Sequence, residues 1–209
     1  MKFKGFTLSE ILITLGIIGV VAAMTIPSVL YKYQSSEYSS RIKKVYGLVS
    51  AAFDEAWREA GGDVTATKLP IDTVRRAIQS TLKVRSFGFG QWYPWYTSSG
   101  ASWDYSVVRY VNSGYILPDG SRFSIYGPNC NTGKFCGYIV DIDSNGEKGP
   151  NIIGKDIFVF IVSEAEPTLK PLHSAIDSSY NGASCSTCTG YSCLDCTTLL
   201  MRNGFEVNW

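Results

Sequence analysis

The chain is 209 residues long, has a formal net charge of +1, and is 45% hydrophobic with 13% aromatic residues. A charge so close to zero excludes two extremes of surface electrostatics, the basic coat of a nucleic-acid binder and a strongly acidic surface. The single histidine further limits the metal and catalytic chemistry available to the side chains.

The first predicted element is an apolar helix of membrane-spanning length. Residues 6–24 are apolar apart from two threonines, one serine and one glutamate. About 20 such residues, at 1.5 Å of rise each, cross a hydrocarbon core of roughly 30 Å. Lys2 and Lys4 precede the segment, so the positive-inside rule places the N-terminus in the cytoplasm and the C-terminal bulk outside. We therefore expect a single-pass anchor with an extracytoplasmic domain.

The glutamate, Glu10, stands inside this apolar helix, where an unpaired charge is costly. The surrounding residues, KGFTLSEILITLGIIG, resemble the N-terminus of type IV prepilins and type II secretion pseudopilins. The resemblance implies cleavage by prepilin peptidase between Gly5 and Phe6, N-methylation of Phe6, and pairing of Glu10 with the N-terminal amine of a neighbouring subunit during assembly. The alternative explanation of Glu10 is local, because Thr7 and Glu10 have the spacing of a capping box.

This reading divides the chain into a leader peptide (1–5), a transmembrane and assembly helix (6–60) and an exported globular domain (61–209). The partners implied by the resemblance are other pilin or pseudopilin subunits, prepilin peptidase and the inner-membrane assembly platform. The implied location is the bacterial inner membrane and then a pilus or pseudopilus filament. One alternative to this membrane-anchored subunit is a secreted metal-binding domain, released by cleavage after the apolar run.

An amphipathic helix follows the apolar segment. Between Ile42 and Ala60, apolar residues recur at steps of three and four while most charged residues fall on the other face. Gly61 and Gly62 end the pattern, because glycine adopts the left-handed C-cap conformation without a steric penalty. The second half of the long helix should therefore pack on the domain.

The rest of the chain predicts one α+β domain, with a helix followed by mainly antiparallel strands. The expected elements are a helix over 70–83, a hairpin over 115–126 with a turn at Pro118-Asp119-Gly120, strands over 137–142 and 156–162, and a last strand within 199–209. Together with the long N-terminal helix, these elements predict a pilin-like fold.

Residues 141–146 read Asp-Ile-Asp-Ser-Asn-Gly, the first half of an EF-hand calcium loop, in which alternate oxygens converge on one ion. The second half does not match, because Ile152 stands where the bidentate glutamate is required. We expect a different calcium loop, whose ligands are Asp141, Asp143, Asn145 and Asp156. The alternative is a turn that needs no metal, since Asp, Asn and Gly form turns by themselves. The segment 137–160 is also similar to a loop and strand of pseudopilins, which favours a secretion system over a long pilus.

The six cysteines all lie in the predicted exported domain, at Cys130, Cys136, Cys185, Cys188, Cys193 and Cys196. The last four have a spacing that also suits a zinc site. Disulfides are favoured, because an exported domain meets an oxidising environment. We expect Cys130 to pair with Cys136, and the other four to form crossed or nested bridges that pin the C-terminal segment.

Aromatic residues are dense between 87 and 105, which offers a rival function from another class. In that alternative, the chain is a membrane-anchored binding protein for glycans or DNA that does not polymerise. Only Arg85 and Arg109 flank the run, and nucleic-acid affinity depends on cationic contacts, so we expect core or subunit packing and no nucleic acid. No phosphate loop or nucleophile elbow accompanies His173, so a structural subunit is expected rather than an enzyme.

Overall fold

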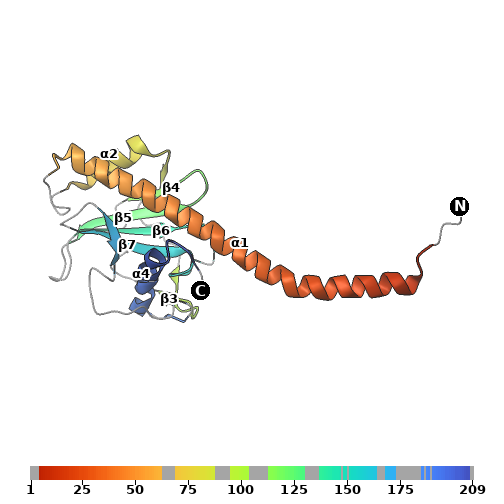
Figure 1. The fold of residues 1–209 in the computed structure, drawn as a ribbon. Coiled ribbons are helices and arrows are strands. Elements are labelled where there is room, and N and C mark those ends of the chain that lie inside the picture. Colours follow the sequence, from red (N-terminus) through yellow and green to blue (C-terminus); the bar gives the residue numbers. More distant parts are fainter. Residues whose placement is uncertain are drawn as a thin grey trace. The chain divides into compact units, whose positions relative to one another are not determined.

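The computed structural model describes residues 5–62, 69–87, 95–103, 113–129, 137–146, 148–149, 151–163, 168–172, 185, 187–188 and 190–207. Contacts divide the chain into two compact units, Met1–Glu37 and Tyr38–Trp209. One helix, α1 (Leu8–Glu59), contributes to both units (Figure 1). The division falls within α1, because the second part of this helix belongs to the core of the second unit. The boundary predicted from the sequence, after residue 60, lies at the end of the helix.

The second unit combines the remaining helices with antiparallel sheet. The elements are α2 (Ile71–Thr81), β1 (Arg85–Phe87), β2 (Trp95–Tyr96), β3 (Ser102–Trp103), β4 (Ser113–Ile116), β5 (Arg122–Asn129), β6 (Gly137–Asp143), β7 (Ile157–Ser163), β8 (Leu169–Pro171), η1 (Gly190–Leu194) and α4 (Asp195–Arg202). Six strands form one sheet in the order β1-β4-β5-β6-β7-β8, and β2 pairs with β3 separately. The predicted α+β class, the helix over 70–83 and the strands over 137–142 and 156–162 are confirmed.

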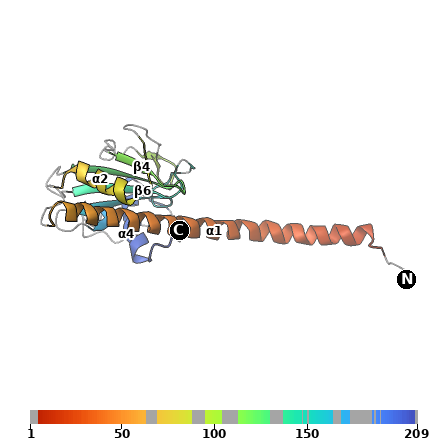
Figure 2. The same ribbon diagram turned by 90° about the horizontal axis from the view of Figure 1, so that it is seen from above.

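The amphipathic part of α1 supplies one wall of the hydrophobic core. Its fully buried residues are Ile42, Val45, Val49, Ala52, Phe53 and Ala56. They pack with α2 and with the side chains that alternate along one face of the sheet, so the two helices cover the same face (Figure 2). The rings of Phe53 and Tyr138 show this contact, with centroids 5.6 Å apart. Burying a phenylalanine of this kind contributes about 2–3 kcal/mol, so the predicted packing face of α1 is a main source of stability.

The predicted hairpin is formed by β4 and β5, with Tyr115 opposite Phe123. Its turn is closed by the Leu117 N–H, which donates to the Ser121 carbonyl at 2.9 Å. Gly120 has a φ of +85°, a conformation that glycine adopts without strain. The turn chemistry therefore fixes the register of β5 against β4.

The predicted last strand is wrong, because residues 195–202 form helix α4. Cys196, Thr197 and Leu200 are buried at helical spacing, so one face of α4 packs inward. The Thr197 hydroxyl accepts a hydrogen bond from the Val159 N–H at 3.1 Å, which satisfies a backbone donor of β7. The helix is thus selected by tertiary contacts that the apolar run 199–201 does not reveal.

Candidate functional site

The N-terminal part of α1 exposes the apolar side chains that a globular domain would bury. Leu12, Ile18 and Met24 are 61%, 63% and 75% exposed. The helix is long and apolar enough to cross a membrane, and none of its most apolar stretch is buried. Exposed apolar surface on this scale marks a site of membrane or protein contact. The first compact unit, Met1–Glu37, therefore requires a lipid or protein environment.

Three hydroxyl groups of this apolar stretch donate hydrogen bonds within the helix itself. The Thr25 hydroxyl donates to the Val21 carbonyl at 2.9 Å, and the Ser28 hydroxyl donates to the Thr25 carbonyl at 2.9 Å. Thr14 bonds back in the same way, to the carbonyl of Glu10. Polar groups that find partners inside their own helix are tolerated in lipid. Glu10 is then the one ionisable side chain between residues 5 and 31.

Glu10 is held at the start of α1 by a capping box with Thr7. The Thr7 N–H and the Thr7 hydroxyl donate to Glu10 Oε2 at 2.8 and 2.9 Å. In return, the Glu10 N–H donates to the Thr7 hydroxyl oxygen at 3.3 Å. The capping box predicted from the spacing of Thr7 and Glu10 is therefore present in the structure. It engages only one of the two carboxylate oxygens within the described residues, so Oε1 is left for a further partner.

The bond between Gly5 and Phe6 lies just before this cap. Residues 5–7 have no helical or strand structure, and α1 begins at Leu8. Phe6 is 83% exposed. This peptide bond is therefore exposed and lies outside the helix, so its cleavage does not require α1 to unfold.

These features coincide with a known motif. Residues 1–26 match the family model described as the prokaryotic N-terminal methylation motif. This motif is the signature of type IV pilins and pseudopilins, and it indicates a substrate of prepilin peptidase. It fits an inner-membrane-anchored protein and implies a structural subunit rather than an enzyme. No curated protein and no solved structure matches the chain.

The methylation motif does not cover the four predicted calcium ligands, Asp141, Asp143, Asn145 and Asp156. In the structure these residues form two separate groups. The first is an Asp143–Asp156 network. Asp143 Oδ1 accepts the N–H groups of Asn145 at 3.1 Å and Gly146 at 2.8 Å. Asp156 Oδ2 accepts the Asn145 side-chain amide at 2.8 Å and the Asn151 N–H at 2.9 Å. Burial raises the pKa of Asp143 to about 7 and also raises the pKa of Asp156.

The second part is Asp141, which does not join that network. Its two carboxylate oxygens accept the Ser124 hydroxyl at 2.5 Å across the β5–β6 pair. Burial raises the pKa of Asp141 to about 7, and the Ser124 hydrogen bond opposes this rise. Three of the four predicted calcium ligands therefore lie together, and the fourth does not.

Some oxygens of the Asp143–Asp156 network remain without partners. Within the described residues, Asn145 Oδ1, Asn151 Oδ1 and the Ser144 hydroxyl are buried and make no hydrogen bond. Hard oxygen donors of this kind suit calcium. No three His, Cys, Asp or Glu side chains gather as a metal group in the described part of the chain, so a cation here would depend on amide and backbone oxygens. Calcium binding stays a prediction.

The C-terminal cysteines form two nested disulfides, Cys185–Cys196 and Cys188–Cys193. The predicted disulfide-pinned C-terminal segment is thus confirmed, in the nested form. All four cysteines are buried, and together they anchor η1 and α4 to the core. The predicted partners Cys130 and Cys136 lie outside the described residues, as does His173.

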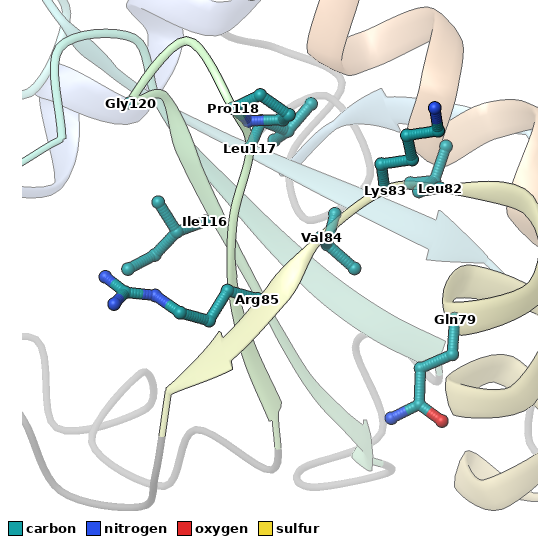
Figure 3. Close-up of a pocket in the computed structure, with 9 residues that line it drawn as sticks. All are labelled: Gln79, Leu82, Lys83, Val84, Arg85, Ile116, Leu117, Pro118 and Gly120. Atoms are coloured by element: carbon teal, nitrogen blue, oxygen red, sulfur yellow. The ribbon is translucent and has the colours of Figure 1, made fainter.

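An open groove of about 710 Å³ runs beside the edge strand β1 (Figure 3). Val84, which directly precedes β1, and Ile116 of β4 are among the apolar side chains that line it. Lys83 and Arg85 are exposed along it, and no acidic side chain is among its lining residues. Sequence reasoning missed this surface, because the two strands that build it are about thirty residues apart in the chain. Half of the eight aromatic residues predicted as a rival binding surface lie outside the described residues; Trp95 and Tyr96 are half-buried in β2.

Proposed function

We propose that this protein is a structural subunit of a type IV pilus-like or type II secretion pseudopilus filament. In this proposal, prepilin peptidase cleaves between Gly5 and Phe6 and the new N-terminus is methylated. The subunit then waits in the inner membrane and joins a filament through the apolar part of α1. The observation that carries the proposal is the match of residues 1–26 to the methylation motif, together with the exposed apolar side chains of the N-terminal part of α1.

Glu10 is the residue that would give assembly its register. A carboxylate is tolerated in an apolar bundle only when a partner neutralises it. The amine created at Phe6 of a neighbouring subunit is such a partner, and Glu10 Oε1 is the oxygen that the capping box leaves for it. Lipid contacts of the apolar helix are exchanged for helix contacts, while this ion pair sets the axial position of each new subunit.

The decisive experiment compares wild type with Glu10→Ala in a strain that has the peptidase and the assembly machinery. We expect both proteins to insert and to be cleaved at the same bond, which mass spectrometry of the N-terminal peptide reports. Filament yield should fall at least tenfold for Glu10→Ala. Thr7→Ala is the matched control, because it removes the hydroxyl bonds of the capping box and leaves the carboxylate. Equal filament yield from Glu10→Ala and wild type would overturn the assembly role of Glu10.

A second candidate function is an anchored binding protein that never polymerises. The groove beside β1 favours it, because Lys83 and Arg85 flank an apolar surface that a ligand could cover. An intact N-terminus in protein isolated from the native membrane would support this alternative. N-methylated phenylalanine at Phe6 would support the filament subunit.

A further inference from the structure

Three consecutive residues, Tyr31, Lys32 and Tyr33, follow the apolar run of α1 and face outward. Tyr31 is 46% exposed and Tyr33 is 68% exposed, and Lys32 is also exposed. Side chains two residues apart on a helix point about 200° apart, so the two tyrosines lie on different sides of α1. The three side chains therefore spread over about 200° of the helix circumference and form a collar rather than one packing face.

The chemistry of this collar suits the boundary between lipid and water. A tyrosine ring favours the apolar side of that boundary, and its hydroxyl favours the wet side. The lysine stem can lie along the acyl chains while its ammonium group reaches the lipid phosphates. Residues 34–37 are glutamine, two serines and glutamate, so the chain becomes polar directly after the collar.

The distance from the collar to Glu10 matches the thickness of the membrane. Tyr31 follows Glu10 by 21 positions in the same helix. At 1.5 Å per residue this is about 32 Å, and a tilt of about 20° reduces its projection to about 30 Å. The hydrocarbon core of a bilayer is also roughly 30 Å thick.

We propose that Tyr31, Lys32 and Tyr33 bind the headgroup region of the outer leaflet of the inner membrane and thereby hold Glu10 at the cytoplasmic boundary of the hydrocarbon. The inference rests on the proposed function, since it describes the subunit before assembly. In this position the Glu10 carboxylate reaches water and headgroups, so its charge needs no protein partner. The stored subunit then avoids the cost of a buried carboxylate.

Assembly changes both ends of this arrangement together. When the subunit is lifted toward the outside, the collar leaves the headgroups and Glu10 enters the hydrocarbon. Both movements are unfavourable, so the subunit resists leaving the membrane until Glu10 meets a neutralising amine. The collar thus sets the depth of the helix in the membrane. It also makes release of the subunit from lipid depend on formation of the Glu10 ion pair.

The test measures the depth of the helix in the membrane without any filament. The full chain is reconstituted in vesicles of phosphatidylethanolamine and phosphatidylglycerol, with a fluorescent amino acid at Leu12, which is 61% exposed. Lipids brominated at different acyl positions then report the depth of the fluorophore by quenching. The variant Y31S/K32S/Y33S removes the collar. The variant Y31W/K32R/Y33W retains its chemistry and serves as the matched control.

We expect the retaining variant to place the fluorophore at the wild-type depth and the collar-free variant to move it by about one helical turn, on the order of 5 Å. An unchanged depth in the collar-free variant would overturn the proposal. If that unchanged depth came with a loss of filaments in cells, the three residues would be a subunit contact and not a lipid contact. The vesicle measurement does not depend on assembly, so its failure is distinct from a failure of the Glu10→Ala experiment.

Discussion

Gly154 packs so closely on Cys196 that a methyl group at Gly154 would lie 2.7 Å from the Cys196 sulfur and 2.8 Å from its Cβ. Gly154 also has a φ of +85°, which side chains other than glycine rarely adopt. This contact joins the loop that precedes β7 to the disulfide that anchors α4. The C-terminal segment and the Asp143–Asp156 network are therefore parts of one packed region.

Gly154→Ala should lower the free energy of unfolding by about 2–4 kcal/mol, because it adds both overpacking and backbone strain. Urea unfolding of the full chain in detergent, followed by tryptophan fluorescence, measures this change. Gly149→Ala is the matched control. Gly149 is exposed, its φ is not positive, and nothing lies within 4 Å of the added methyl group. Similar midpoints for the two variants would show that the Gly154 contact is not limiting.

The two disulfides should contribute unequally to stability. Cys185 and Cys196 are separated by 11 positions, and Cys188 and Cys193 by 5. In the chain-entropy model, loops of these sizes are worth about 2.8 and about 2.1 kcal/mol. We expect the variant C185A/C196A, which lacks the outer disulfide, to unfold at a lower urea concentration than C188A/C193A, which lacks the inner one. The reverse order would show that native packing, rather than loop closure, decides their contributions.

Strongly periodic or locally coded features of this chain could be predicted from its sequence. The length of α1 follows from its apolar and amphipathic patterns, and the Thr7–Glu10 capping box follows from a spacing of three. The pairing of Asp141 with Ser124 could not be predicted, because it depends on the register of β5 against β6. Helix α4 was missed for a similar reason, since its conformation depends on Cys196 and on long-range packing.

The pair formed by Lys44 and Asp119 predicts a weak acid dependence of stability. The Lys44 ammonium lies 2.8 Å from Asp119 Oδ2, and Asp119 Oδ1 accepts the Ser121 N–H at 3.0 Å. Burial alone would raise the pKa of Asp119, but these hydrogen bonds and the Lys44 charge lower it to about 2, from an ordinary value of 3.8. The folded pKa lies below the unfolded one, so the stabilisation is present above about pH 4 and is lost as the pH falls through about 2.

Asp119→Asn should therefore remove a pH-dependent contribution of less than about 1 kcal/mol, which is small because the pair is partly exposed to solvent. Urea unfolding at pH 2 and pH 6 measures it. The difference between variant and wild type should be larger at pH 6. Asp54→Asn serves as the control, because Asp54 is an exposed carboxylate of α1 with no ion pair among the described residues. A pH-independent effect of Asp119→Asn would contradict the assignment.

The buried carboxyl of Asp141 predicts that stability falls as the pH rises toward neutral, the opposite of the trend predicted for Asp119. Its pKa in the folded protein, about 7, lies above the ordinary 3.8, so folding opposes its ionisation. Stability should decline as the pH rises from about 4 to about 7. Ser124→Ala removes the hydroxyl that donates to the carboxylate, so its cost should be about 1–3 kcal/mol larger at pH 8 than at pH 5.

This measurement is made in EDTA so that no cation contributes. Ser80→Ala is the matched control, since the Ser80 hydroxyl donates to a neutral acceptor, the Ala77 carbonyl, at 3.0 Å. Its effect should not change with pH. An equal cost of Ser124→Ala at both pH values would show that Asp141 keeps one protonation state across this range.

Calcium should stabilise the domain through the Asp143–Asp156 network and not through Asp141. The buried Asn145 Oδ1 makes no hydrogen bond within the described residues, and the Asn145 amide already donates to Asp156. A cation that binds only the folded protein raises its melting temperature by mass action. We expect 1 mM calcium (about 1–10 times a typical extracellular-module Kd) to raise the melting temperature over EDTA in wild type and in Ser124→Ala, but not in Asn145→Ala. If calcium leaves wild type unchanged, the loop is a metal-free turn, in which Asp143 and Asp156 organise the backbone by accepting its N–H groups.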